Sequence, residues 1–179
     1  MKHFLMMAAL LAGTVCMAEN LLVNGDMKNS KAWLIANAPQ DAAIRAKILT
    51  YVDEGPNGGR VLKFEDCCED FNPHLIQWAK VSGVTPEQQY KLTFSLKAEK
   101  GKSVWFMIQM AGKSKYIGAC DVRKFVGTGD WKKHEVVFSK AKPETTMFGI
   151  EFLPSNPYKG GKEQTGSFLL TDVSLERLP

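Results

Sequence analysis

Hydrophobic and polar residues alternate in several short segments of the chain, which is typical of β-strands with one buried face. The clearest segment is Tyr90–Ala98, where large apolar side chains occupy every second position and polar side chains lie between them. A polar loop with a glycine, residues 99–102, follows it and suits a hairpin turn. The next segment, residues 104–110, differs because Trp105 and Met107 make its second face apolar as well. A tryptophan on that face indicates a surface that meets another molecule.

The same alternation predicts further strands on both sides of this hairpin. They are His74–Val81, Trp131–Phe138, Thr146–Leu153 and Phe168–Leu175. Proline and glycine make residues 154–161 a loop, and residues 36–47 are expected to form one short helix. Motifs stand near both ends of the chain, at residues 20–27 and 168–175, and a sandwich of two antiparallel sheets often places its first and last strands side by side. We therefore expect an all-β fold, an antiparallel β-sandwich, that forms a single domain.

The first 18 residues have the pattern of a secretory signal peptide. Lys2 is followed by an apolar run, Phe4–Ala12, that is too short to cross a bilayer as a helix, and Cys16 and Ala18 are small residues before Glu19. Cleavage after Ala18 would leave one domain of residues 19–179. We expect a secreted, periplasmic or cell-surface protein without a membrane span. Lipidation of Cys16 is the alternative, which the preceding Thr14 and Val15 disfavour.

Charge gives no sign of a nucleic-acid partner. The formal net charge is +4, and basic and acidic residues are interspersed. The densest basic stretch, Lys113–Lys115, contains just two lysines, whereas binding to phosphate backbones favours a basic stripe with interleaved aromatic residues. We therefore expect no nucleic-acid binding.

Three cysteines follow the signal peptide: Cys67, Cys68 and Cys120. In an exported protein they predict a disulfide between Cys120 and either Cys67 or Cys68. A metal site is the alternative, because the segment 65–70 with His74 gathers thiols, carboxylates and an imidazole. Adjacent cysteines do not match the spaced pairs of zinc sites, so the disulfide is favoured.

Four segments together resemble a known family. They are Asn24-Gly25-Asp26-Met27 leading to Trp33, then Tyr90–Ala98, then Gly129-Asp130-Trp131 leading to Phe138, and Thr171–Leu175. Their order and spacing resemble the carbohydrate-binding modules of families four, nine and twenty-two. The resemblance implies a galactose-binding-like jelly roll that holds a poly- or oligosaccharide without cleaving it. It also implies Trp33 and Trp131 as packing residues, and a separately encoded glycoside hydrolase as a partner.

The resemblance also raises the question of calcium. Many relatives have a phenylalanine and a glutamate after the Asn-Gly element, and that glutamate helps the terminal aspartate, here Asp172, to hold a structural calcium ion. This chain has Met27 and Lys28 at those positions. A lysine places positive charge where the ion would lie, so either calcium or an ammonium partner for Asp172 is compatible with the sequence.

Sugar rings present hydroxyl groups at their edges and C–H groups on their faces, so a binding site combines flat aromatic side chains with amides or carboxylates. Trp105 and Gln109 lie on one face of their strand, since they are four residues apart. The face of Trp78 depends on whether residues 81–84 contain a bulge. The expected ligand-binding residues are Trp78, Trp105, Gln109, Tyr116, Glu135 and Glu151.

Catalysis is not expected. A glycosidase needs two carboxylates, which Glu135 and Glu151 could supply, but nothing in their sequence context marks either as a general acid. Nucleophile-elbow, zinc-protease and phosphate-loop motifs do not occur in the sequence. The alternative to a carbohydrate-binding module is a structural or adhesion module that uses the same face for a protein partner at the cell surface.

Overall fold

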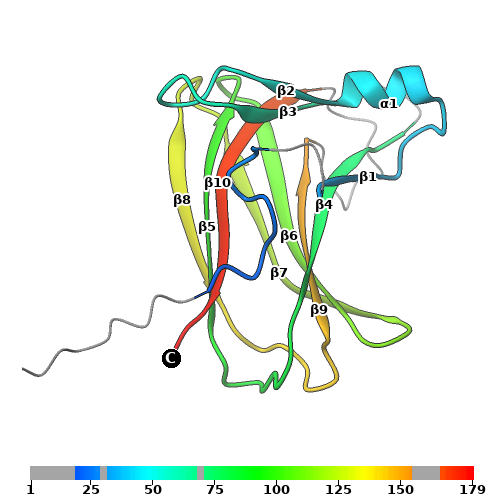
Figure 1. Ribbon diagram of the computed structural model, residues 1–179, viewed down its shortest axis with the longest axis vertical. Helices are drawn as coiled ribbons and strands as arrows, with labels where there is room; N and C mark the ends of the chain where they lie inside the picture. The colour runs from blue at the N-terminus through cyan, green and yellow to red at the C-terminus, as the bar shows by residue number, and fades with distance from the viewer. Residues whose placement is uncertain (1–18, 29–31, 68–70, 155–165) are drawn as a thin grey trace, which may run out of the picture.

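The computed structural model describes residues 19–28, 32–67, 71–154 and 166–179. In this part of the chain ten strands form two antiparallel five-stranded sheets, which pack face to face as a sandwich (Figure 1). Sheet I has the order β1 (Leu34–Ala36), β4 (His74–Lys80), β9 (Met147–Leu153), β6 (Ser103–Ala111) and β7 (Tyr116–Val126). Sheet II has the order β2 (Leu49–Val52), β3 (Val61–Glu65), β10 (Ser167–Arg177), β5 (Tyr90–Ala98) and β8 (Lys132–Phe138). The predicted all-β sandwich is confirmed.

The core lies between the sheets and is built by the side chains that the alternation pattern directs inward. Phe94 of β5 meets Phe152 of β9 edge to face, with ring centroids 5.0 Å apart. Trp33 is buried as expected and lies against the same Phe152 ring. Aromatic pairs in these arrangements stabilise a core beyond the area that they bury. On β8 the buried side chains are Val136 and Phe138, which face the other sheet.

The two ends of the described chain lie side by side, as predicted. The Leu21 amide donates to the Leu175 carbonyl at 2.8 Å, and the Val173 amide donates to the Gly25 carbonyl at 2.9 Å. The Asn20 side-chain oxygen accepts from the amides of both Leu22 and Leu175. A Cβ at position 25 would lie 1.8 Å from the Val173 carbonyl oxygen, so glycine is required there.

The predicted helix is present but shorter than expected. It is α1, Ala42–Ile48, and it begins where the Asp41 carboxylate accepts hydrogen bonds from the amides of Ala43 and Ile44. Such a cap stabilises a helix start that Pro39 delays. Within the described ranges, no helix is both long and apolar enough to cross a membrane. The predicted signal peptide, residues 1–18, lies outside the described residues.

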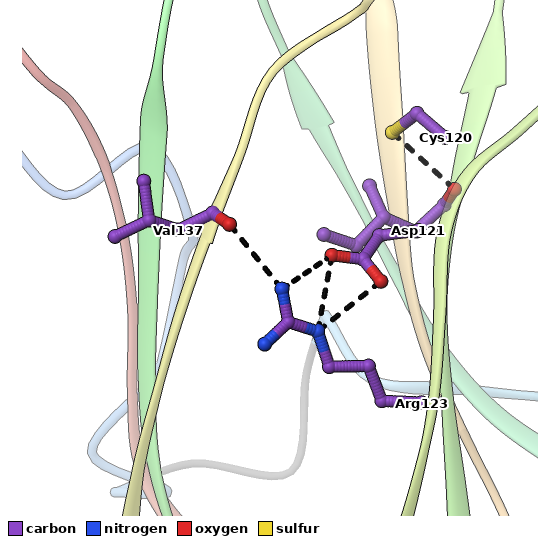
Figure 2. Close-up of polar contacts among 5 residues, drawn as sticks. Cys120, Asp121, Arg123 and Val137 are labelled. Atoms are coloured by element: carbon purple, nitrogen blue, oxygen red, sulfur yellow. Dashed lines mark hydrogen bonds and ion pairs between the residues drawn. The ribbon is translucent and has the colours of Figure 1, made fainter.

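Strand β7 was not predicted, and it forms one edge of sheet I. Its register against β6 shifts next to Gln109, and Cys120 and Asp121 lie at this bulge. The Arg123 guanidinium contacts the Asp121 carboxylate through Nε at 3.1 Å and through Nη2 at 2.8 Å (Figure 2). The same Nη2 donates to the Val137 carbonyl of β8 at 3.3 Å. One side chain therefore links the edges of the two sheets.

The predicted disulfide is not formed, because Cys120 is a free thiol. Cys120 lies on β7, beside β8, whereas Cys67 follows β3, which is three strands away from β8 in sheet II. Three strand spacings amount to about 14 Å, beyond the Cα separation that a disulfide can bridge. The Cys120 thiol instead approaches the Ile108 carbonyl at 3.6 Å, and burial raises its pKa to about 12. Cys68 lies outside the described residues.

Candidate functional site

Trp78 lies on the outer face of sheet I, which settles the register that the sequence left open. Its neighbours Gln77 and Ala79 point into the core, while 36% of Trp78 is exposed. Trp78 is paired with Gly149 of β9, and Gly149 is paired with Gln109 of β6. The indole ring covers the glycine, since a Cβ at position 149 would lie 2.9 Å from its Cζ3 atom. The missing side chain lets a flat aromatic ring lie against the sheet.

A buried carboxylate stands next to this ring. Glu151 is two residues along β9 from Gly149, and only 2% of it is exposed. Its Oε1 accepts a hydrogen bond from Nδ1 of His74 at 2.7 Å, and its Oε2 accepts from Nε2 of Gln109 at 2.5 Å. A carboxylate at this distance places the imidazole hydrogen on Nδ1. Glu151 therefore fixes the side chains on either side of it and is not itself open to a ligand.

His74 is the residue of this site that the sequence analysis did not select. Its Nε2 atom is buried and has no hydrogen-bond partner among the described residues. A buried polar atom without a partner is unusual and favours contact with a ligand or water. The spacing offered a signal, because His74 and Trp78 are four residues apart on one strand and so share its face.

Two further predicted aromatics share sheet I but lie apart from Trp78. Trp105 is half-buried on β6 and faces Leu153 on one side and Lys124 on the other. It is two strands and four residues from Trp78, a separation of about 16 Å at standard strand spacings. Tyr116 begins β7 at the opposite end of the face and is 60% exposed. The three rings are separate contact points and do not form one continuous floor.

Glu135 does not belong to this face. It lies on β8 opposite Thr93 and is exposed on the outer face of sheet II. The alternation of side chains along a strand separates its inner face from its outer face but cannot say which sheet carries the strand. Because the sheets pack about 10 Å apart and Glu135 and Glu151 point away from each other, the two carboxylates cannot flank one glycosidic bond.

The residues near Asp172 do not gather a calcium ligand set within the described part of the chain. Lys28 forms an ion pair with Asp26 at 2.8 Å, and this hydrogen bond lowers the pKa of Asp26. Asp172 is exposed at the bulge of β10, in a left-handed backbone conformation with φ of 53°. No group of three or more His, Cys, Asp and Glu side chains suited to a metal ion occurs among the described residues. Calcium at Asp172 stays a prediction.

Trp131 was expected in the core and is instead half-buried at the surface. Its indole N–H donates to the Glu54 carbonyl at 3.2 Å, so it ties the start of β8 to the loop after β2. This contact explains why an aromatic residue precedes β8 without entering the sandwich. Trp131 and Glu135 both belong to the sheet II side of the molecule.

Comparison with known proteins places the fold. No family model matches the chain, and a search of curated proteins found no similar sequence. The structure of TmCBM61 in complex with β-1,4-galactotriose has a TM-score of 0.57 and 15% identity, and the match covers 90% of this chain and 100% of that one. A family 4 carbohydrate-binding module has a TM-score of 0.59 and 14% identity, covering 88% and 99%. The fold is the jelly roll of carbohydrate-binding modules.

A similar jelly roll also forms part of a protein whose description names an enzymatic activity. The enzymatically active domain of tailspike protein 4 from bacteriophage CBA120 has a TM-score of 0.62 and 12% identity, with 89% of this chain matched to 21% of that one. Modules of families 16, 11 and 22 are similar as well. Since one fold supports many functions, the function has to be argued from the site.

Proposed function

We propose that the protein binds carbohydrate without cleaving it, on the outer face of sheet I around Trp78. The observation that carries the proposal is the Trp78 ring, which lies against Gly149 beside the side-chain amide of Gln109. A half-exposed flat ring suits the C–H face of a sugar, and an amide at its edge suits the hydroxyl groups. A pocket for small ligands combines these same elements, an apolar surface with a few placed polar groups.

Each residue has a distinct role in this proposal. Gln109 uses one N–H for Glu151, which leaves its second N–H and its carbonyl oxygen for sugar hydroxyls. His74 is held through Nδ1, and its Nε2 is the atom without a partner in the described part of the chain. Glu151 is a positioning residue that orders both neighbours before a ligand arrives. Order established before binding lowers the entropy cost of binding.

Trp105 and Tyr116 would extend the contact toward opposite ends of the face. A ligand that touches Trp78 and either of them must span about 16 Å, which favours an oligosaccharide over a single sugar. Two similar structures were solved with such ligands, β-1,4-galactotriose and a β-1,3-1,4-mixed-linked tetrasaccharide. These glycans are suitable first probes. A leader at residues 1–18 would place the protein outside the cytoplasm, where such glycans occur.

The test is a glycan array with the purified protein, followed by calorimetry on any ligand found. The variants are Trp78→Ala and Gln109→Ala, and the control is Trp131→Ala, a half-buried tryptophan on the sheet II side. We expect both site variants to lose binding while the control retains it. Absence of binding across a broad array by a folded protein would refute the proposal and leave the adhesion module as the explanation of the face.

A further inference from the structure

A cavity of about 230 Å³ is lined by the end of β4, the start of β5 and the end of β10. These three segments lie at the same end of the sandwich (Figure 1). The lining of the cavity is Leu21, Lys80, Val81, Ser82, Tyr90 and Arg177. The lining combines apolar surface from three elements with two basic side chains. Acidic residues are missing from this set of described residues, so nothing within the cavity wall balances the positive charge.

Tyr90 gives the cavity a rigid aromatic wall. Its ring stacks on Phe138 with centroids 5.5 Å apart and meets Phe148 edge to face at 4.9 Å. The residue is 1% exposed, and its hydroxyl group is buried with no hydrogen-bond partner among the described residues. Burial raises the pKa of the Tyr90 phenol, and the positive charge of Arg177 opposes this rise. A buried hydroxyl of this kind calls for a partner.

Arg177 is held in place while keeping donors free. Its Nη2 donates to the Gly83 carbonyl at 2.9 Å, and its Nη1 approaches the Ser82 carbonyl at 3.3 Å. A guanidinium has five N–H groups in a fixed fork, so three remain for a ligand. Neither Arg177 nor Lys80 forms an ion pair with any residue that the structure describes. A positioned guanidinium without a carboxylate partner is suited to bind one.

We propose that this cavity binds a small organic carboxylate whose apolar body is about the size of one ring. The carboxylate would accept from Arg177 and Lys80, and the body would lie among Leu21, Val81 and the Tyr90 ring. The volume is below the range typical of drug-sized ligands, which limits the ligand to a small molecule. This site is separate from the glycan surface and does not depend on it.

Benzoate is the probe, and benzamide is its uncharged analogue of nearly the same shape. Titration of the isotope-labelled protein, followed by amide chemical shifts, should give saturable changes at Val81, Ser82, Tyr90 and Arg177. Benzamide should bind more weakly than benzoate by about tenfold or more, because benzamide cannot form charge-assisted hydrogen bonds. Equal binding of the two probes would overturn the proposal, and so would saturable changes that map elsewhere or no saturable change.

Variants separate a ligand site from a structural feature. Arg177→Gln and Lys80→Gln should each weaken benzoate binding about tenfold, whereas Lys124→Gln, an exposed lysine of β7, should not change it. Tyr90→Phe keeps the ring that the ligand body contacts and removes only the buried hydroxyl, so it should retain both the fold and benzoate binding. Unchanged benzoate affinity in Arg177→Gln and Lys80→Gln would overturn the proposal. Glycan binding should be the same in all these variants, so the two proposals can fail independently.

Discussion

Replacing Gly149 with alanine tests whether the Trp78 ring lies against β9. The added methyl group would lie 2.9 Å from Cζ3 and 3.0 Å from Cη2 of Trp78, and 3.2 Å from Cδ1 of Ile76. Carbon atoms normally approach to about 3.5–4.0 Å, so the ring has to rise from the sheet by about 0.5–1 Å. The ring can do so because Trp78 is 36% exposed.

The free energy of unfolding should change little, because two effects oppose each other. Moving the indole away from its preferred rotamer costs about 0.5–1.5 kcal/mol. Replacing a glycine within a strand by alanine stabilises the folded state by about 0.5–1 kcal/mol. We therefore expect a net loss of no more than about 1 kcal/mol in a urea titration. Sugar affinity should nevertheless fall about fivefold or more, equivalent to about 1 kcal/mol, because the ring no longer lies at the correct height.

The measurements are urea unfolding, tryptophan emission and calorimetry with the glycan found on the array. Gly59→Ala is the matched control, since a Cβ at position 59 meets no atom within 4 Å. In a Trp78→Ala background, Gly149→Ala should no longer cost stability, and the coupling free energy of this cycle reports the contact directly. Additive effects of the two substitutions, or an unchanged emission spectrum in Gly149→Ala, would show that the ring does not cover this glycine.

Three further predictions concern buried polar groups. Glu151→Ala removes the hydrogen-bond partner of His74 and Gln109, so it should lower the free energy of unfolding by about 1–3 kcal/mol in urea titrations. An unchanged urea midpoint would contradict these two hydrogen bonds. The Cys120 thiol, with a pKa of about 12, should resist iodoacetamide at pH 8 until the protein unfolds, while the exposed Cys67 reacts in the native state. Because folding raises the pKa of Cys120 above its ordinary value of 9.0, the contribution of this thiol to stability is complete below pH 9 and is lost toward pH 12. Burial lowers the pKa of His134, so the contribution of His134 to stability is present above its unfolded pKa of about 6.5 and is lost as the pH falls through its lower folded pKa. His134→Leu should therefore lose less thermal stability than the wild type between pH 7 and pH 5. Melting temperatures that fall in parallel with pH in the two proteins would refute this prediction.

The strands were predictable where one face meets the core along the whole segment. β5 has the predicted bounds, Tyr90–Ala98, because strict alternation fixes both its length and its buried face. β7 was missed because its register shifts twice against β6 and its residues do not keep a period of two. Gly118 lies within this strand and has a φ of 146°, which glycine adopts more readily than other residues. Bulged edge strands lack the pattern on which sequence reasoning depends.

The candidate site was predictable residue by residue but not as an arrangement. Parity showed that Glu135 and Glu151 point outward, but strand order decides which sheet carries each, and contacts between distant segments set that order. Parity also could not show that Glu151 is buried between His74 and Gln109. The pairing of Trp78 with Gly149 depends on the register between β4 and β9. A glycine within a strand that otherwise carries large residues was the available hint of a close approach.

The pairing of the chain's two ends has a mechanical consequence. The segment at residues 20–25 runs antiparallel to β10, so Leu21 is bonded to Leu175 near the end of the strand and Gly25 to Val173 further in. A force that pulls residues 19 and 179 apart would load these hydrogen bonds one after another, from the outermost inward, rather than all together. The protein should therefore open like a zipper at low force when it is stretched from its ends. A force that is applied through a ligand bound on sheet I would not act directly on the hydrogen bonds between residues 20–25 and β10.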